Sequence, residues 1–317
     1  MSLVVFSHGN SFPGATYTVM LDALRARGHE AVAVDKYGHD PAYPVTSNWP
    51  HLVQQLADFV VNHTTQGTGP LFLVGHSLGG FLSLMCAAKH PILAGRPVAG
   101  VVMLDSPVLG GWRARALEAA KHTRLIGALS PGQVSRARRN SWASAEEALA
   151  HFAQKKSFAR WDPRVLRDYI AHGTHDVATH SGTRRVLTFD REVETRIYNT
   201  LPHNLDRLLR RHPLPCPVAF VGGTASAEMR QVGMVMTHQL VGKTPSDRLQ
   251  MVEGTHLFPM ERPEETAAAI DRALRSFQVV DGFQGVQFTQ PPQAVSNTSV
   301  PKAMRYQANG TKVWLVT

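Results

Sequence analysis

Residues 71–80 read LFLVGHSLGG, and this stretch decides the architecture of the chain. A run of apolar residues meets Gly75, Ser77 and Gly79 at the point where a helical pattern begins. A serine in such a sharp strand-to-helix turn needs small residues two positions away on either side, because a Cβ there would collide with the adjoining strand and helix. The stretch therefore predicts a turn that lifts the Ser77 hydroxyl clear of a sheet.

Further short apolar runs alternate with amphipathic stretches of helical periodicity. The runs that we interpret as strands are residues 3–6, 31–34, 71–74, 100–104, 217–221 and 248–252. Strands that alternate with helices indicate a parallel sheet with helical crossovers, and continuous apolar runs are typical of strands buried on both faces. We therefore expect an α/β fold with about six mostly parallel strands.

Differences in composition divide the whole chain into four predicted segments. Residues 1–106 and 214–280 form the two parts of the α/β core. Residues 107–213 carry little strand signal and many helical patterns, so we expect a helical cap insertion over the carboxyl edge of the sheet. Residues 281–317 are rich in Gln, Pro, Ser, Thr and Asn, which predicts a loosely ordered, low-complexity tail.

Two more motifs follow predicted strands at the same edge as Ser77. The sequence His8-Gly9-Asn10 comes after the first strand, where a tight turn would bring the Asn10 amide beside the Leu78 amide. Two such donors can stabilise an oxyanion, although the motif is also compatible with a purely structural turn. His256 follows the last strand, and from there it could accept the serine proton and pass it to a leaving group.

The motifs HGN, GHSLGG and EGTH, in this order, resemble the α/β-hydrolase superfamily, in particular its esterase-like and MhpC-like members with a helical cap. The resemblance covers residues 1–106 and 214–280. It implies a serine hydrolase that cleaves a carboxylic ester or thioester with no cofactor and no metal. Most members begin with two further strands, so the resemblance also implies a sheet that lacks the first two.

The acid of the expected catalytic triad departs from the common pattern. Many superfamily members carry an aspartate after the strand before the last, where this chain has Ser226. A serine cannot stabilise an imidazolium as a carboxylate does. Asp105 ends the fourth strand, where some lipases and haloalkane dehalogenases place their acid, and we favour it. Glu228 is the alternative acid, and the absence of a true acid is a third possibility.

Charge is concentrated in one part of the chain. The formal net charge is +9, and residues 107–213 contain 19 Lys and Arg against 10 Asp and Glu. The rest of the chain is balanced, and no nucleic-acid-binding motif accompanies the excess. The excess is compatible with a solvated helical surface, or with a positive rim that steers anionic substrates such as acids or coenzyme A thioesters.

The remaining features bear on location and on competing functions. The sequence predicts no membrane span and no secretory signal, and Cys86 and Cys216 are expected to be buried free thiols, so we expect a cytoplasmic protein. The same fold could instead support acyl transfer, C–C cleavage or lyase chemistry. A non-catalytic ligand-binding protein is the remaining alternative, and the serine at position 226 favours it.

Overall fold

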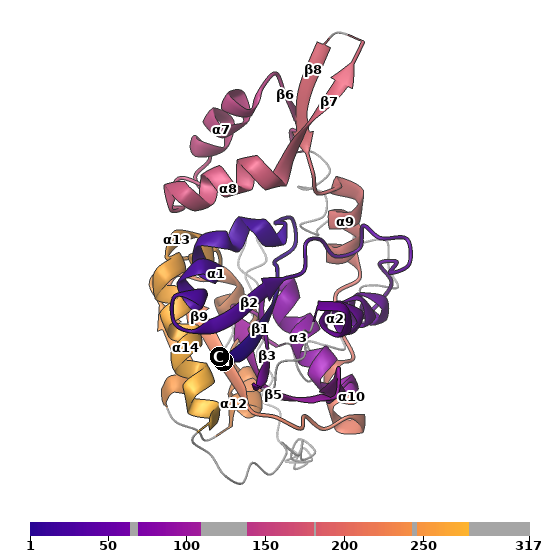
Figure 1. Ribbon diagram of the computed structural model, residues 1–317, viewed down its shortest axis with the longest axis vertical. Helices are drawn as coiled ribbons and strands as arrows, with labels where there is room; N and C mark the ends of the chain where they lie inside the picture. The colour runs from indigo at the N-terminus through magenta and orange to yellow at the C-terminus, as the bar shows by residue number, and fades with distance from the viewer. Residues whose placement is uncertain (64–68, 109–137, 181, 243–245, 279–317) are drawn as a thin grey trace, which may run out of the picture.

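The computed structural model describes residues 1–63, 69–108, 138–180, 182–242 and 246–278. Its centre is a parallel sheet in the order β10-β9-β5-β3-β1-β2 (Figure 1). The strands are β1 (Ser2–Ser7), β2 (His29–Ala33), β3 (Leu71–His76), β5 (Arg96–Leu104), β9 (Val218–Gly223) and β10 (Leu249–Val252). A short β4 (Ile92–Leu93) pairs antiparallel with β5. The predicted sheet of about six mostly parallel strands is confirmed.

Helices cover both faces of this sheet. The helices of the α/β core are α1 (Thr18–Arg25), α2 (Pro50–His63), α3 (Leu78–Lys89), α11 (Ala227–Val232), α12 (Val235–Val241), α13 (Phe258–Glu261) and α14 (Pro263–Gln278), with 3-10 turns η1 (Gly14–Tyr17) and η2 (Ser246–Arg248). Alternate residues of β1 point to opposite faces: Leu3 and Val5 pack with α2 and α3, whereas Val4 and Phe6 pack with α1 and α14. Burial on both faces explains the continuous apolar runs.

The segment expected to be a helical cap is not entirely helical, and this expectation is corrected. Its described helices are α7 (Ala145–Ala153), α8 (Pro163–Gly173), α9 (Arg191–Asn199) and α10 (Leu205–Arg211). It also contains an antiparallel sheet of β6 (Ser141–Trp142), β7 (Thr174–Thr179) and β8 (Gly182–Leu187). The β7–β8 hairpin projects from the body (Figure 1) and is largely exposed, so its sequence lacks the apolar alternation that identifies a half-buried strand.

Other expectations have mixed outcomes. Cys86 and Cys216 are buried free thiols, as predicted. Residues 109–137 of the predicted cap and the predicted tail, residues 281–317, lie outside the described part of the chain. Within the described residues, no helix is both long enough and apolar enough to cross a membrane.

Candidate active site

Ser77 lies in the turn between β3 and α3, in a conformation that serine rarely adopts. Its φ and ψ are 53° and −114°, and such strained backbone costs on the order of 1–3 kcal/mol. A Cβ on Gly75 would lie 2.1 Å from the carbonyl carbon of Gly79, and one on Gly79 would lie 1.9 Å from the carbonyl oxygen of Ser7. The requirement for glycine on both sides of Ser77 is therefore steric, as the sequence predicts.

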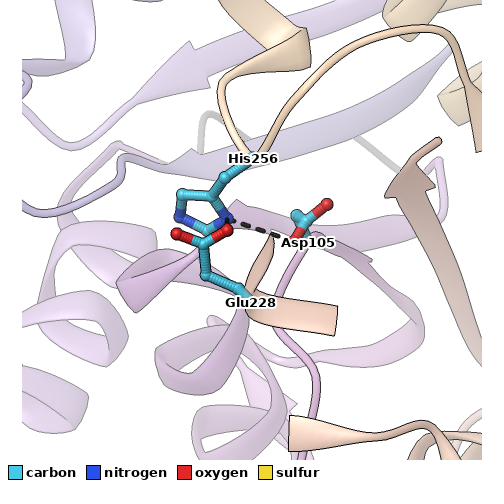
Figure 2. A group of neighbouring side chains, drawn as sticks. All are labelled: Asp105, Glu228 and His256. Carbon is cyan, nitrogen blue, oxygen red and sulfur yellow. Dashed lines mark hydrogen bonds and ion pairs between the residues drawn. The ribbon is translucent and has the colours of Figure 1, made fainter. Parts of the chain in front are cut away.

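His256 lies in the loop between β10 and α13 and faces Ser77. Its Nε2 atom is 3.0 Å from Ser77 Oγ. Its Nδ1 atom is 3.1 Å from Asp105 Oδ1, the contact drawn in Figure 2. The structure thus brings Ser77, His256 and Asp105 into one chain of hydrogen bonds from three separate loops. In this geometry the imidazole can accept a proton from the serine on one side while a carboxylate orients it on the other.

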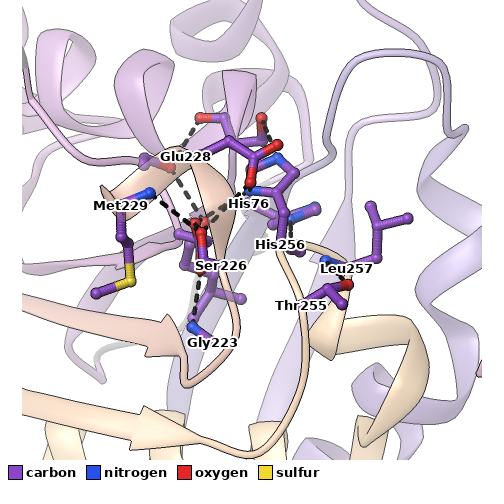
Figure 3. Close-up of polar contacts among 12 residues, drawn as sticks. His76, Gly223, Ser226, Glu228, Met229, Thr255, His256 and Leu257 are labelled. Carbon is purple, nitrogen blue, oxygen red and sulfur yellow. Dashed lines mark hydrogen bonds and ion pairs between the residues drawn. The ribbon is translucent and has the colours of Figure 1, made fainter. Parts of the chain in front are cut away.

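Asp105 follows β5 and is buried, with a backbone φ of 44°. Its Oδ2 atom accepts a hydrogen bond of 2.8 Å from the Gly223 amide, and its Oδ1 atom accepts one of 2.7 Å from Ser226 Oγ. The two donor residues, Gly223 and Ser226, are labelled in Figure 3. Hydrogen bonds to a carboxylate stabilise its charged form. Ser226 therefore does not replace the missing aspartate. It donates to the carboxylate that comes from the neighbouring strand, a role that the sequence analysis did not assign.

Glu228, in α11, is a second carboxylate beside the imidazole. Its Oε2 atom lies 3.9 Å from His256 Nδ1, and its side chain is 46% exposed. Burial alone would lower the pKa of His256, but the hydrogen bond to Asp105 and the charges of Asp105 and Glu228 together raise it above its ordinary value. Glu228 thus acts on the imidazole through charge, whereas Asp105 also holds it by a hydrogen bond.

Asp105, Glu228 and His256 also form the one group with spacing suited to a metal ion among the described residues. Their ligand atoms all lie within 4.8 Å of one another (Figure 2). However, Asp105 already accepts hydrogen bonds from Gly223 and Ser226, and His256 Nδ1 contacts Asp105. Asp105 and His256 thus already use these atoms in hydrogen bonds with one another and with Gly223 and Ser226, an arrangement that suits proton transfer.

The residues expected to stabilise an oxyanion, Leu78 and Asn10, come from two different segments near Ser77. Leu78 is the first residue of α3, where an amide N–H has no acceptor within the helix. Asn10 follows β1 and lines the same cavity as Ser77. His8 shapes the intervening turn: its Nδ1 lies 2.8 Å from the Gly9 carbonyl oxygen, and its Nε2 accepts from the Tyr37 amide. Burial lowers the pKa of His8 to about 4, so this ring is neutral at neutral pH.

Glu194, a buried acid of the predicted cap that is ion-paired with Arg138, contacts the Asn10 loop, and the sequence analysis did not identify these contacts. Glu194, in α9, accepts a 2.5 Å hydrogen bond from Ser11 Oγ and lies 2.8 Å from Arg138 Nη2. Its backbone carbonyl accepts from Asn10 Nδ2 at 3.1 Å. Asn10 and Ser11 are more than 180 positions from Glu194 along the chain, so no local pattern could have revealed these contacts.

A cavity of about 850 Å³ contains both Ser77 and His256. Part of its wall is apolar and is formed by Phe12, Phe158 and Leu257. Its basic residues are Arg138, Lys155, Lys156 and Arg160, and its acidic residues are Glu194, Glu228 and Glu261. The cavity is therefore shared between the carboxyl edge of the sheet and the segment expected to form the cap.

Two of these basic residues are ion-paired and two are not paired within the described chain. Arg138 pairs with Glu194, and Arg160 Nε lies 3.3 Å from Glu261 Oε2. No carboxylate of the described residues forms an ion pair with Lys155 or Lys156, which lie in the loop between α7 and α8. A bound anion would therefore meet two lysines whose charge no described acid neutralises.

Three features together define the class of α/β hydrolases. They are a parallel sheet, a strained serine at the carboxyl edge of this sheet, and a histidine after the last strand that is hydrogen-bonded to the serine. Comparison with known sequences agrees: the model of the alpha/beta hydrolase family matches residues 4–269. The chain belongs to this family.

Individual relatives are more distant. A pyrethroid hydrolase of Sphingobium wenxiniae is 31% identical over 106 residues, which span 32% of this chain and 35% of that protein. The structure of E-2-(acetamidomethylene)succinate hydrolase superposes with a TM-score of 0.62 at 21% identity, covering 87% of this chain and 92% of the other. The peroxisomal α/β-hydrolase Lpx1 of Saccharomyces cerevisiae gives a TM-score of 0.63 at 14% identity, covering 92% and 81%. These structural similarities establish the fold.

Proposed function

We propose that the protein is a serine hydrolase that cleaves a carboxylic ester or thioester through an acyl-enzyme intermediate. Ser77 attacks the carbonyl carbon while His256 accepts its proton, and Asp105 orients and stabilises the resulting imidazolium. His256 gives this proton to the leaving group. It then removes a proton from water, which attacks the acyl-enzyme, and it returns this proton to Ser77 Oγ as the acid is released. The Leu78 and Asn10 amides donate hydrogen bonds to the oxyanion formed in both steps.

The observation that carries this proposal is the pair of contacts made by one imidazole. Ser77 Oγ lies 3.0 Å from His256 Nε2, and Asp105 Oδ1 lies 3.1 Å from Nδ1 of the same ring. Both distances suit proton transfer from a nucleophile to an oriented base. The strain at Ser77 adds support, because strained backbone concentrates at functional sites. Membership of a family of hydrolases is consistent with this chemistry.

The experiment that tests the proposal is hydrolysis of short-chain p-nitrophenyl esters by the wild-type chain and by Ser77→Ala. We expect the variant to lose at least about 10³-fold in kcat, because the nucleophile is gone. Ser83→Ala is the matched control: this buried serine lies in α3, the helix that follows Ser77, and its hydroxyl has no hydrogen-bond partner in the described structure. Equal turnover by wild type and Ser77→Ala would contradict the proposal, and failure of a fluorophosphonate probe to label Ser77 would favour a non-catalytic binding protein.

We also propose that the substrate carries a negative charge. Lys155 and Lys156 line the cavity that contains Ser77 and have no ion-pair partner in the described residues. A carboxylate or phosphate on the substrate would supply the missing counter-charge. The two lysines would then orient the remote end of the substrate while its carbonyl lies at Ser77, and the excess positive charge of residues 107–213 would assist its approach.

A further inference from the structure

Tyr17 and His76 form a buried chain of hydrogen bonds that the catalytic steps above do not use. The Gly9 amide lies 3.0 Å from Tyr17 Oη, and Tyr17 Oη lies 2.8 Å from His76 Nδ1. His76 Nε2 in turn lies 2.9 Å from the backbone carbonyl oxygen of His256. The chain therefore connects the loop that bears Asn10 with the loop that bears His256, and it passes through the residue just before Ser77.

The direction of every hydrogen bond in this chain follows from its two ends. The His256 carbonyl can only accept, so His76 Nε2 carries the hydrogen. Burial lowers the pKa of His76 well below its ordinary value, so the ring is neutral and its Nδ1 is an acceptor. Tyr17 must then donate to Nδ1, which leaves its oxygen to accept from the Gly9 N–H. Every donor and acceptor in this chain then has a partner, and all three hydrogen bonds run in the same direction, from Gly9 to His256.

Close packing leaves this chain little freedom. Tyr17 and His76 are each 1% exposed, and the Tyr17 ring lies against Phe6 with a centroid separation of 4.6 Å. A Cβ on Gly9 would lie 2.8 Å from His76 Nδ1 and 3.0 Å from Tyr17 Oη. The main chain of the Gly9–Asn10 loop can thus approach the side chains of Tyr17 and His76 only because residue 9 is glycine.

We propose that Tyr17 and His76 are positioning residues, which fix the His256 loop and the Gly9–Asn10 loop at the separation that the reaction requires. The proposal rests on the proposed hydrolase function. The base His256 and the oxyanion donor Asn10 must both lie close to the reacting carbonyl, yet their loops are almost 250 residues apart along the chain. Small displacements of such groups lower the rate of the chemical step more than they weaken substrate binding.

The first test is Tyr17→Phe, which keeps the ring and removes the hydroxyl. We expect kcat for a p-nitrophenyl ester to fall about 10- to 100-fold while KM stays within about twofold, because the Gly9 amide and His76 Nδ1 lose their shared partner. The matched control is Tyr37→Phe. Tyr37 is also fully buried and its hydroxyl contacts Ser7 Oγ at 2.7 Å, but this contact does not lead to His256. A comparable loss of stability in both variants, with kcat reduced in Tyr17→Phe alone, supports the proposal.

A second pair of variants keeps the proposal testable if Tyr17→Phe does not fold. His76→Gln offers an amide donor toward the His256 carbonyl, whereas His76→Leu offers none, so we expect His76→Gln to retain at least about tenfold more kcat. Equal kcat in these two variants, or a Tyr17→Phe kcat within about twofold of wild type, would overturn the positioning role. If the wild type turns over esters no faster than Ser77→Ala, the hydrolase proposal itself fails, and this inference fails with it.

Discussion

His256 Nδ1 lies 3.1 Å from Asp105 Oδ1, close enough for a hydrogen bond, and this contact favours Asp105 over Glu228 as the proposed acid. Glu228 Oε2 lies 3.9 Å from the same nitrogen, on a side chain that is almost half exposed. A buried carboxylate with a direct hydrogen bond sets the tautomer of the ring, which a more distant, solvated charge cannot do. The two carboxylates should therefore contribute very unequally to catalysis.

Conservative amide substitutions measure this difference. We expect Asp105→Asn to lower kcat by about 10⁴-fold, since the amide can favour the wrong tautomer of His256. We expect Glu228→Gln to lower it by less than about tenfold, because that variant removes a charge and no hydrogen bond to the ring. The measurement is steady-state hydrolysis of one p-nitrophenyl ester by both variants. A larger loss in Glu228→Gln would identify Glu228 as the acid instead.

The pH dependence of the reaction should report the raised pKa of His256. The imidazole must be neutral to accept the serine proton, so activity falls as the pH drops through its pKa. Because Asp105 and Glu228 raise this pKa, the acid limb of kcat/KM should lie above the ordinary histidine value of 6.5. Glu228→Gln removes one of the two charges, so its acid limb should move to lower pH. A limb below 6.5 in the wild type, or no movement in the variant, would contradict this assignment.

Residue patterns predicted those parts of the structure whose conformation depends on the local sequence. Apolar runs located the strands because parallel strands are buried on both faces, and the spacing of Gly75, Ser77 and Gly79 located the strained turn. The β7–β8 hairpin was missed because strands exposed on both faces carry no apolar alternation.

Contacts between distant segments could not be read from the sequence in the same way. The sequence suggested Asp105 as the acid from its place at a strand end, but it could not reveal that Ser226 donates to that carboxylate. The bond becomes visible once β5 and β9 are known to be neighbours in the sheet. The contacts of Glu194 with Asn10 and Ser11 are equally remote along the chain.

The proximity of Ser226 to Asp105 suggests that the acid can be moved between neighbouring strands. Ser226 Oγ lies 2.7 Å from Asp105 Oδ1, so a carboxylate at position 226 would lie close to the same imidazole. We expect the double variant Asp105→Asn/Ser226→Asp to recover at least about tenfold in kcat over Asp105→Asn alone.

The corresponding single variant provides the control for this exchange. Ser226→Asp places a second carboxylate against Asp105, and repulsion between them should lower the melting temperature without raising kcat. The measurements are ester hydrolysis and thermal unfolding of the single and double variants. No recovery in a double variant that folds would show that position 226 cannot orient His256.

The preference for anionic substrates can be tested with two esters of equal length. Mono-p-nitrophenyl adipate carries a terminal carboxylate and p-nitrophenyl hexanoate does not. If Lys155 and Lys156 bind the carboxylate, Lys155→Gln/Lys156→Gln should lower kcat/KM for the adipate by about tenfold and change the hexanoate value by less than about twofold. Added salt should lower the adipate rate of the wild type more than that of the variant, because screening removes the same attraction.

The control variant is Lys36→Gln/Lys89→Gln, which removes equal charge outside this cavity. It should leave the ratio of the adipate and hexanoate rates unchanged. An equal loss for both esters would show that the lysines do not select for charge.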